Sequence, residues 1–164
     1  MKIIEKNSIH YNSRPQDADI DCIVIHHTGG GTLAGCLSWF QDINSQVSAH
    51  YVLDANGDVY QCCPEEKRAW HAGNSSYKGV EDCNDYSIGI ELLGDGSFYA
   101  NKQIDSLVEL TIGIMSRHKH ITVDRIVGHE NVAMPMGRKK DPGGNFPWVD
   151  YRAKVRAGLG SAEL

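Results

Sequence analysis

The segment Cys22–His27 constrains the fold of this chain more than any other stretch. Its continuous run of apolar, mostly β-branched residues is typical of a central strand that is buried on both faces of a sheet. The run ends in two histidines, which a threonine and three glycines follow. Because side chains alternate along a strand, His26 should share the side of Val24, and His27 the side of Ile25. We therefore expect only one of the two histidines to face a given site.

Three helices are expected further along the chain. The first should begin after Thr32, a suitable N-cap, because apolar residues then recur at helical spacing at Leu33, Cys36, Leu37, Phe40 and Ile43. The same periodicity predicts a long helix over about 103–118. A last helix should follow Pro147, with a frayed tail from Gly158.

Strands alternate with these helices. Apolar runs and alternation predict strands over 47–53, 59–62, 87–92 and 125–127, and Asn56-Gly57 is a hairpin turn signal between the first two. Such an order indicates the α/β class, with a central mixed β-sheet flanked by helices. At 164 residues the chain should form a single domain over 1–164, with a core of about 20–157.

Charge and cysteine content limit the function classes. The net charge of −5 argues against a partner such as nucleic acid, and no apolar run is long enough to span a membrane. No apolar export signal follows Met1, so we expect the chain to be cytoplasmic at synthesis. We also expect a monomer. The five cysteines form an odd set without a CxxC motif, which favours a reducing compartment and no structural disulfide.

Late in the sequence, Gly128-His129-Glu130 and the stretch Arg138–Gly143 bring an imidazole, an ammonium and a carboxylate close together. Pro142 favours an extended backbone at Asp141, so Lys139 and Asp141 should point to the same side. A histidine and an aspartate supply two of the three protein ligands of a catalytic zinc site. The third should be a histidine at another strand end. The stretch taken alone also fits a solvated basic turn.

The strand 87–92 offers a candidate general base. Ile88, Ile90 and Leu92 should face a core, so Ser87, Gly89 and Glu91 should face the opposite way. A glutamate on a face of small residues could act as a base, although an ordinary exposed strand glutamate is the alternative. His26, Glu91 and His129 all lie at or near strand ends, where ligands bind in sheets of this class.

Taken together, six ordered stretches resemble the type 2 N-acetylmuramoyl-L-alanine amidases, over roughly residues 20 to 150. This superfamily includes small phage endolysins, bacterial cell-wall-recycling amidases and peptidoglycan recognition proteins. The stretches are Ile23–Thr28, Ser48–Tyr51, Ala69–Gly73, Ser87–Leu92, Gly128–Glu130 and Arg138–Gly143. The resemblance implies the amidase fold and a site for Zn²⁺.

The resemblance also implies a role for individual residues. It assigns the zinc ligands to His26, His129 and Asp141. It assigns the general base to Glu91, stabilisation of the transition state to Lys139, and substrate binding to His71 and Asn74. Two departures from the family pattern occur: the loop with Ala133–Met136 is slightly longer, and Ala49 replaces a tyrosine that is catalytic in another branch.

The implied activity is zinc-dependent hydrolysis of the amide between the lactyl group of muramic acid and L-alanine, with peptidoglycan or a muropeptide as substrate. We expect a phage endolysin for host lysis, because small single-domain members of the superfamily have that role. A cytosolic amidase that recycles anhydromuramyl-peptides is the alternative. A non-catalytic peptidoglycan-binding module is less expected, because all three ligand positions are filled. A zinc peptidase would differ in the bond it cleaves.

Overall fold

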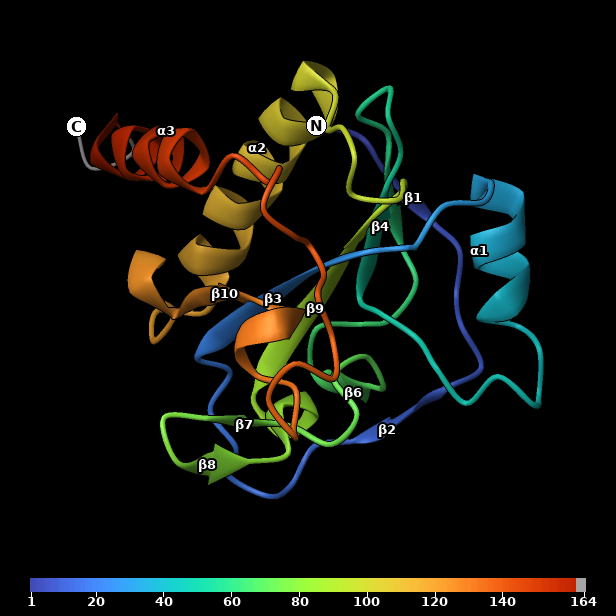
Figure 1. The fold of residues 1–164 in the computed structure, drawn as a ribbon. Helices are drawn as coiled ribbons and strands as arrows, with labels where there is room; N and C mark the ends of the chain where they lie inside the picture. Colours follow the sequence, from blue (N-terminus) through green and yellow to red (C-terminus); the bar gives the residue numbers. More distant parts are fainter. Residues whose placement is uncertain (162–164) are drawn as a thin grey trace.

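The computed structural model describes residues 1–161, which fold around one six-stranded sheet (Figure 1). Its strand order is β1 (Ile3–Glu5), β5 (Val59–Gln61), β4 (Tyr51–Leu53), β9 (Ser87–Leu92), β3 (Cys22–His27) and β10 (Ile126–Gly128). Only β4 and β5 pair antiparallel, and the other neighbouring strands are parallel. The sheet is therefore mixed, as predicted. Because β1 is an edge strand, the sheet includes a segment that precedes the expected core of about 20–157.

Short elements surround this sheet. Two small antiparallel pairs join β2 (Tyr11–Ser13) to β6 (Lys67–Ala69) and β7 (Ser76–Tyr77) to β8 (Val80–Glu81). Three single turns of 3-10 helix are η1 (Cys83–Asp85), η2 (Val123–Arg125) and η3 (His129–Asn131).

Residues 1–161 contain three α-helices, as the sequence predicted: α1 (Leu33–Trp39), α2 (Asn101–Arg117) and α3 (Trp148–Ser161). The first helix is shorter than predicted, because it ends at Trp39 and leaves Ile43 exposed. The Thr32 side chain accepts a hydrogen bond from the Gly35 amide, so it caps α1 as expected. The expected fraying is wrong for residues 158–161, because α3 continues to Ser161, and residues 162–164 lie outside the described part of the chain. A Cβ at Gly158 would lie 2.3 Å from Cδ1 of Ile112 in α2, so this glycine permits close packing of the two helices.

One face of the sheet carries the main hydrophobic core. Alternate residues of β3 and β9 join α2 and α3 there, which lie together on one side of the sheet in Figure 1. The buried residues from these two strands are Ile23, Ile25, Ile88, Ile90 and Leu92. Burying each of these side chains contributes roughly 1.5–3 kcal/mol. The prediction that Ile88, Ile90 and Leu92 face a core is confirmed.

The opposite face of the sheet is divided into two parts. At one end, Val24 packs with the segment around η1 and with Val132. At the other end, Val52 packs against the apolar side of α1, which stands apart from α2 and α3 (Figure 1). Between them lies His26, which pairs in register with Glu91. The sheet therefore presents a histidine and a carboxyl side by side, between α1 and the loops.

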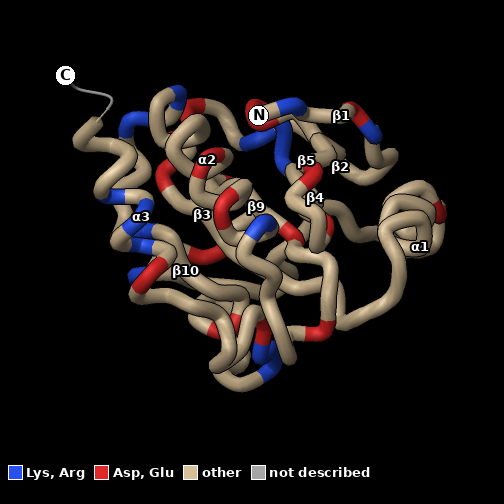
Figure 2. Tube along the Cα trace, turned by 90° about the horizontal axis from the view of Figure 1, so that it is seen from above, with Lys and Arg blue, Asp and Glu red and all other residues tan. Residues whose placement is uncertain are grey.

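Charged residues of both signs are spread over the surface, with several basic residues along α3 (Figure 2). Two of these bind acidic groups on neighbouring elements: Lys154 pairs with Asp105 of α2, and Arg156 pairs with Asp124 of η2. These pairs hold α3 against the elements beside it. Among residues 1–161, none of the helices combines the length and apolar character needed to cross a membrane.

Candidate metal and catalytic site

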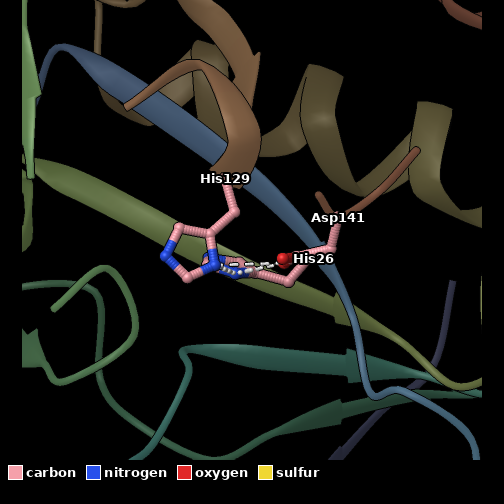
Figure 3. A group of neighbouring side chains, drawn as sticks. All are labelled: His26, His129 and Asp141. Carbon is pink, nitrogen blue, oxygen red and sulfur yellow. Dashed lines mark hydrogen bonds and ion pairs between the residues drawn. The ribbon is translucent and has the colours of Figure 1, made fainter. Parts of the chain in front are cut away.

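Three predicted ligand side chains converge at the carboxyl ends of the central strands (Figure 3). Nδ1 of His26 lies 3.0 Å from Nδ1 of His129, and each of these nitrogens lies 3.1 Å from Oδ2 of Asp141. A tetrahedral zinc site with bonds of about 2.0–2.1 Å separates its ligand atoms by roughly 3.3 Å. The three atoms therefore have close to the spacing that zinc requires.

The fold brings each of these side chains in on a different element. His26 is near the end of β3, and His129 begins η3 directly after β10, the parallel neighbour of β3. Asp141 comes from the loop before α3, where its carbonyl accepts a hydrogen bond from the Glu130 amide at 2.9 Å. A Cβ at Gly128 would lie 2.7 Å from Cδ of Pro142, so this glycine lets the loop approach β10 closely.

Hydrogen bonds on the far side of each imidazole orient the ring. Nε2 of His129 lies 3.1 Å from the carbonyl oxygen of Ala72, which can only accept, so Nε2 carries the proton and Nδ1 keeps a lone pair. Nε2 of His26 lies 3.0 Å from Nδ1 of His71. Burial lowers the pKa of His26 to about 4, so the ring is neutral at neutral pH. Two imidazoles and a carboxylate form a donor set of the catalytic zinc type.

The carboxylate is held in its charged form. Burial by itself would raise the pKa of Asp141, but the adjacent side chains of His129 and His26 outweigh this effect and hold the pKa below the usual range. Asp141 is thus ionised at neutral pH and available to a cation.

Glu91 and Lys139 line the same cavity of about 440 Å³ as these three residues. Glu91 is half-buried, and its enclosed Oε2 has no hydrogen-bond partner among the described residues. Burial and the negative charge of Asp141 raise the pKa of Glu91 to about 8, although the Lys139 ammonium opposes the shift. Lys139 and Asp141 both face the cavity, whereas Lys140 is not among its lining residues. This arrangement agrees with the predicted extended geometry.

Apolar side chains line the same cavity. They include Trp39 and Phe40 from the end of α1, Val47 from the following loop, and Trp70. Trp39 is 53% exposed, so its ring remains available for contact. The cavity therefore combines titratable groups with aromatic side chains.

Of the two residues expected to bind substrate, His71 lines the cavity and Asn74 does not. His71 is buried, and its two ring nitrogens lie within hydrogen-bonding distance of His26 and Ser87. Asn74 is exposed and is not among the residues that line the cavity. Its carbonyl accepts hydrogen bonds from the Met134 amide and the Arg138 guanidinium. The Asn74 side chain therefore does not reach the cavity. Its backbone instead anchors the loop that contains Met134 and Arg138.

Arg138 is a residue of this region that sequence reasoning missed. Its guanidinium donates to the carbonyls of Met134, Ala72 and Asn74 at 2.7–3.0 Å, which fastens the longer loop across the 72–74 segment. Met136 in that loop is 90% exposed. The only signal in the sequence was the position of Arg138 beside Lys139. Ala49, in contrast, is fully buried and lies outside the cavity lining, so it takes no part in the site.

Comparisons with known proteins agree with this geometry. The family described as N-acetylmuramoyl-L-alanine amidase matches residues 16–144. The chain is 40% identical to the 1,6-anhydro-N-acetylmuramyl-L-alanine amidase AmpD of Haemophilus influenzae, and the match covers 91% of this chain and 90% of that protein.

Solved structures give the same result. A crystal structure of a selenomethionine derivative of AmpD superposes with a TM-score of 0.85 at 36% identity, covering 93% of this chain and 94% of that one. The amidase AmiD from Escherichia coli, solved with anhydro-N-acetylmuramic acid-L-Ala-D-γ-Glu-L-Lys, has a TM-score of 0.72 at 34% identity, with coverage of 86% and 60%. A mutant endolysin from Bacillus subtilis shares the fold, with a TM-score of 0.69 at 23% identity and coverage of 94% and 99%.

Proposed function

Because the chain belongs to the N-acetylmuramoyl-L-alanine amidase family, we propose that it is a zinc-dependent amidase that acts on soluble 1,6-anhydromuramyl-peptides. The bond hydrolysed is the amide between the lactyl group of muramic acid and L-alanine. The observation that carries the proposal is the convergence of His26, His129 and Asp141 in one cavity with Glu91, whose buried Oε2 has no hydrogen-bond partner among the described residues.

Under this proposal, His26, His129 and Asp141 hold zinc. When bound, the metal would supply a Lewis acid that polarises the scissile carbonyl and lowers the pKa of water. Three protein ligands suit this purpose, since catalytic sites keep a further position open. The hydrogen bonds to the outer nitrogen of each imidazole support the assignment, because metal-binding histidines usually donate their other ring N–H.

Glu91 is the proposed general base. A base works best when its pKa is near the working pH, and burial together with Asp141 raises the pKa of Glu91 to about 8. A positive charge held by the three ligands would lower this pKa towards neutrality. Glu91 can then take a proton from the attacking water and return it to the leaving amine. The Lys139 ammonium can stabilise the negative charge that develops on the carbonyl oxygen.

The comparisons favour the recycling alternative over the expected phage endolysin. A relative whose name specifies the 1,6-anhydro substrate matches nearly the full length of both chains at 40% identity. The endolysin structure, at 23% identity, supports a shared fold alone. A binding-only module is disfavoured because every proposed ligand, the base and the lysine are present in one cavity.

The test offers two substrates to the purified protein. One is a soluble 1,6-anhydromuramyl-tripeptide, and the other is intact sacculi. We expect mass spectrometry to find a free lactyl carboxylate on the sugar product and a peptide that begins with the amino group of L-alanine. The Glu91→Gln variant, assayed in parallel, controls for a contaminating hydrolase. Rapid clearing of sacculi with the soluble substrate untouched would instead support lysis, and a new amino group inside the stem peptide would indicate a peptidase.

A further inference from the structure

Behind His26, a chain of hydrogen bonds runs into the interior of the protein. Nε2 of His26 lies 3.0 Å from Nδ1 of His71, and Nε2 of His71 lies 3.1 Å from Oγ of Ser87. The Ser87 hydroxyl donates to the carbonyl oxygen of Cys83. His26, His71 and Ser87 are all buried, at 1%, 9% and 0% exposure, so water does not compete well for these bonds.

The chemistry of the last acceptor sets the direction of the whole chain. The Cys83 carbonyl only accepts, so the Ser87 proton points to it and Oγ is left as an acceptor for His71 Nε2–H. With its proton on Nε2, neutral His71 presents the lone pair of Nδ1 to His26. His26 must therefore carry its own proton on Nε2, which frees Nδ1 for the cluster with His129 and Asp141.

A glycine in β9 makes room for this arrangement. A Cβ at Gly89 would lie 2.3 Å from Cγ of His71, far inside van der Waals contact. Gly89 thus serves to admit the His71 ring to the sheet surface beside His26. Its neighbours on the same strand face are Ser87, which binds the ring, and Glu91, which lines the cavity.

We propose that His71 is a positioning residue that fixes the tautomer and orientation of the metal ligand His26, through the chain that ends at the Cys83 carbonyl. It does not bind substrate by hydrogen bonding, because both ring nitrogens are engaged inside the protein. The inference rests on the proposed metal site. Removing a residue that hydrogen-bonds to a metal-binding histidine typically lowers metal affinity or activity by about 10- to 100-fold.

The test measures zinc affinity by competition with a chromophoric chelator, independently of turnover. His71→Leu removes both ring nitrogens and leaves His26 Nε2–H without its acceptor. His71→Asn places an amide oxygen near the position of Nδ1, so it can accept that proton again. We expect His71→Leu to weaken zinc binding about 10- to 100-fold, and His71→Asn to restore most of the loss. If His71 served only to stabilise the fold, the folded His71→Leu and His71→Asn variants would both bind zinc as tightly as the unaltered protein.

Ser87→Ala provides a second, milder variant in case His71→Leu does not fold. It leaves both histidines in place but removes the acceptor of the His71 proton, so we expect a smaller loss of zinc affinity. Thr111→Val is the matched control, because it removes a buried hydroxyl that bonds Tyr151 in the distant α2–α3 core. That variant should lose stability and keep the original zinc affinity.

Nitrogen-15 spectra of the imidazoles give an independent signature. In the unaltered protein we expect the Nε2–H tautomer at both His26 and His71. Zinc binding as tight in His71→Leu and Ser87→Ala as in the unaltered chain would overturn the inference while leaving the proposed metal site intact. Failure of the unaltered protein to bind zinc would overturn both.

Discussion

At the scale of single residues, Glu91 is unusual because its Oε2 is buried without a hydrogen-bond partner among the described residues. An ionised carboxyl buried without a hydrogen bond is destabilising, and its pKa of about 8 reflects that cost. The neighbouring Asp141 is different, because the adjacent side chains of His129 and His26 lower its pKa. Two acidic groups in one cavity are thus separated in pKa by their surroundings, which suits one as a base and the other as a ligand.

Glu91→Gln should keep the fold and the bound zinc but lose most of the turnover. The amide has nearly the same shape, yet it cannot accept the proton of the attacking water. Removing a general base costs on the order of 10²–10⁴ in rate. Because the substitution also removes a buried unpaired carboxyl, the thermal midpoint should not fall. Steady-state kinetics and metal analysis on the same preparation check this, and near-normal turnover would assign the base to another group.

Each of His26→Ala, His129→Ala and Asp141→Ala should abolish stoichiometric zinc binding and activity. The three ligand atoms lie within 3.1 Å of one another, so a site that loses one retains only two protein ligands. Elemental analysis after gel filtration provides the measurement. His10→Ala is a suitable control, because this buried histidine binds the Asp42 carbonyl away from the cluster. Full zinc occupancy in all three variants would refute the ligand assignment.

At the scale of elements, one buried carboxyl joins the end of α2 to β4. Glu65 accepts hydrogen bonds from Tyr51 of β4 at 2.7 Å, from Arg117 at 2.7 and 3.1 Å, and from His118 at 2.7 Å. His118 directly follows α2, at the end of the helix where the helix dipole favours a positive charge. The structure adds a specific partner 53 residues away, which periodicity along one helix cannot reveal.

Glu65→Gln should destabilise the protein by about 1–3 kcal/mol, because it weakens several charge-assisted hydrogen bonds at once. Burial raises the pKa of Glu65, but the bonds from Arg117, Tyr51 and His118 outweigh it and lower the pKa from 4.5 to about 2. The stabilisation is therefore complete above pH 4.5 and is lost as the pH falls through about 2.

Urea unfolding at several pH values tests this linkage. The difference in stability between the unaltered protein and Glu65→Gln should shrink as the pH falls from 4.5 towards 2. Glu66→Gln is the matched control, since this neighbouring glutamate is exposed. An equal effect of both substitutions, or a difference that does not depend on pH, would contradict the assigned role of Glu65.

The elements were predictable where a local pattern specifies them. The strands 22–27 and 87–92 have the predicted bounds, because their apolar runs and alternation are local properties. The strand expected over 47–53 begins only at Tyr51, because the Ser48 amide bonds to the carbonyl of Trp70 in a distant loop. Likewise the pairing of His71 with Ser87 could not be predicted, because only the folded sheet brings that loop over Gly89.

At the scale of the whole molecule, the cavity is assembled from segments spread over most of the chain. The residues that line it come from β3, α1, the loop at 70–71, β9 and the segment between β10 and α3. All of them converge on the sheet face opposite α2 and α3, so the main core supports the site from behind. The arrangement needs no covalent cross-link, and all five cysteines are free within the described residues.

The thiols of this protein should accordingly remain reduced. Titration of the denatured, unreduced protein should find five free thiols.

In the native protein, burial raises the pKa of Cys36, Cys62 and Cys63 to about 12, so they should react slowly with alkylating reagents. Cys36 should react first, because it is the one partly exposed cysteine of residues 1–161 and it borders the cavity. A bound muropeptide should slow that reaction further. A count of one or three thiols, or a thermal midpoint that falls on adding a reductant, would mean that a disulfide contributes to the fold.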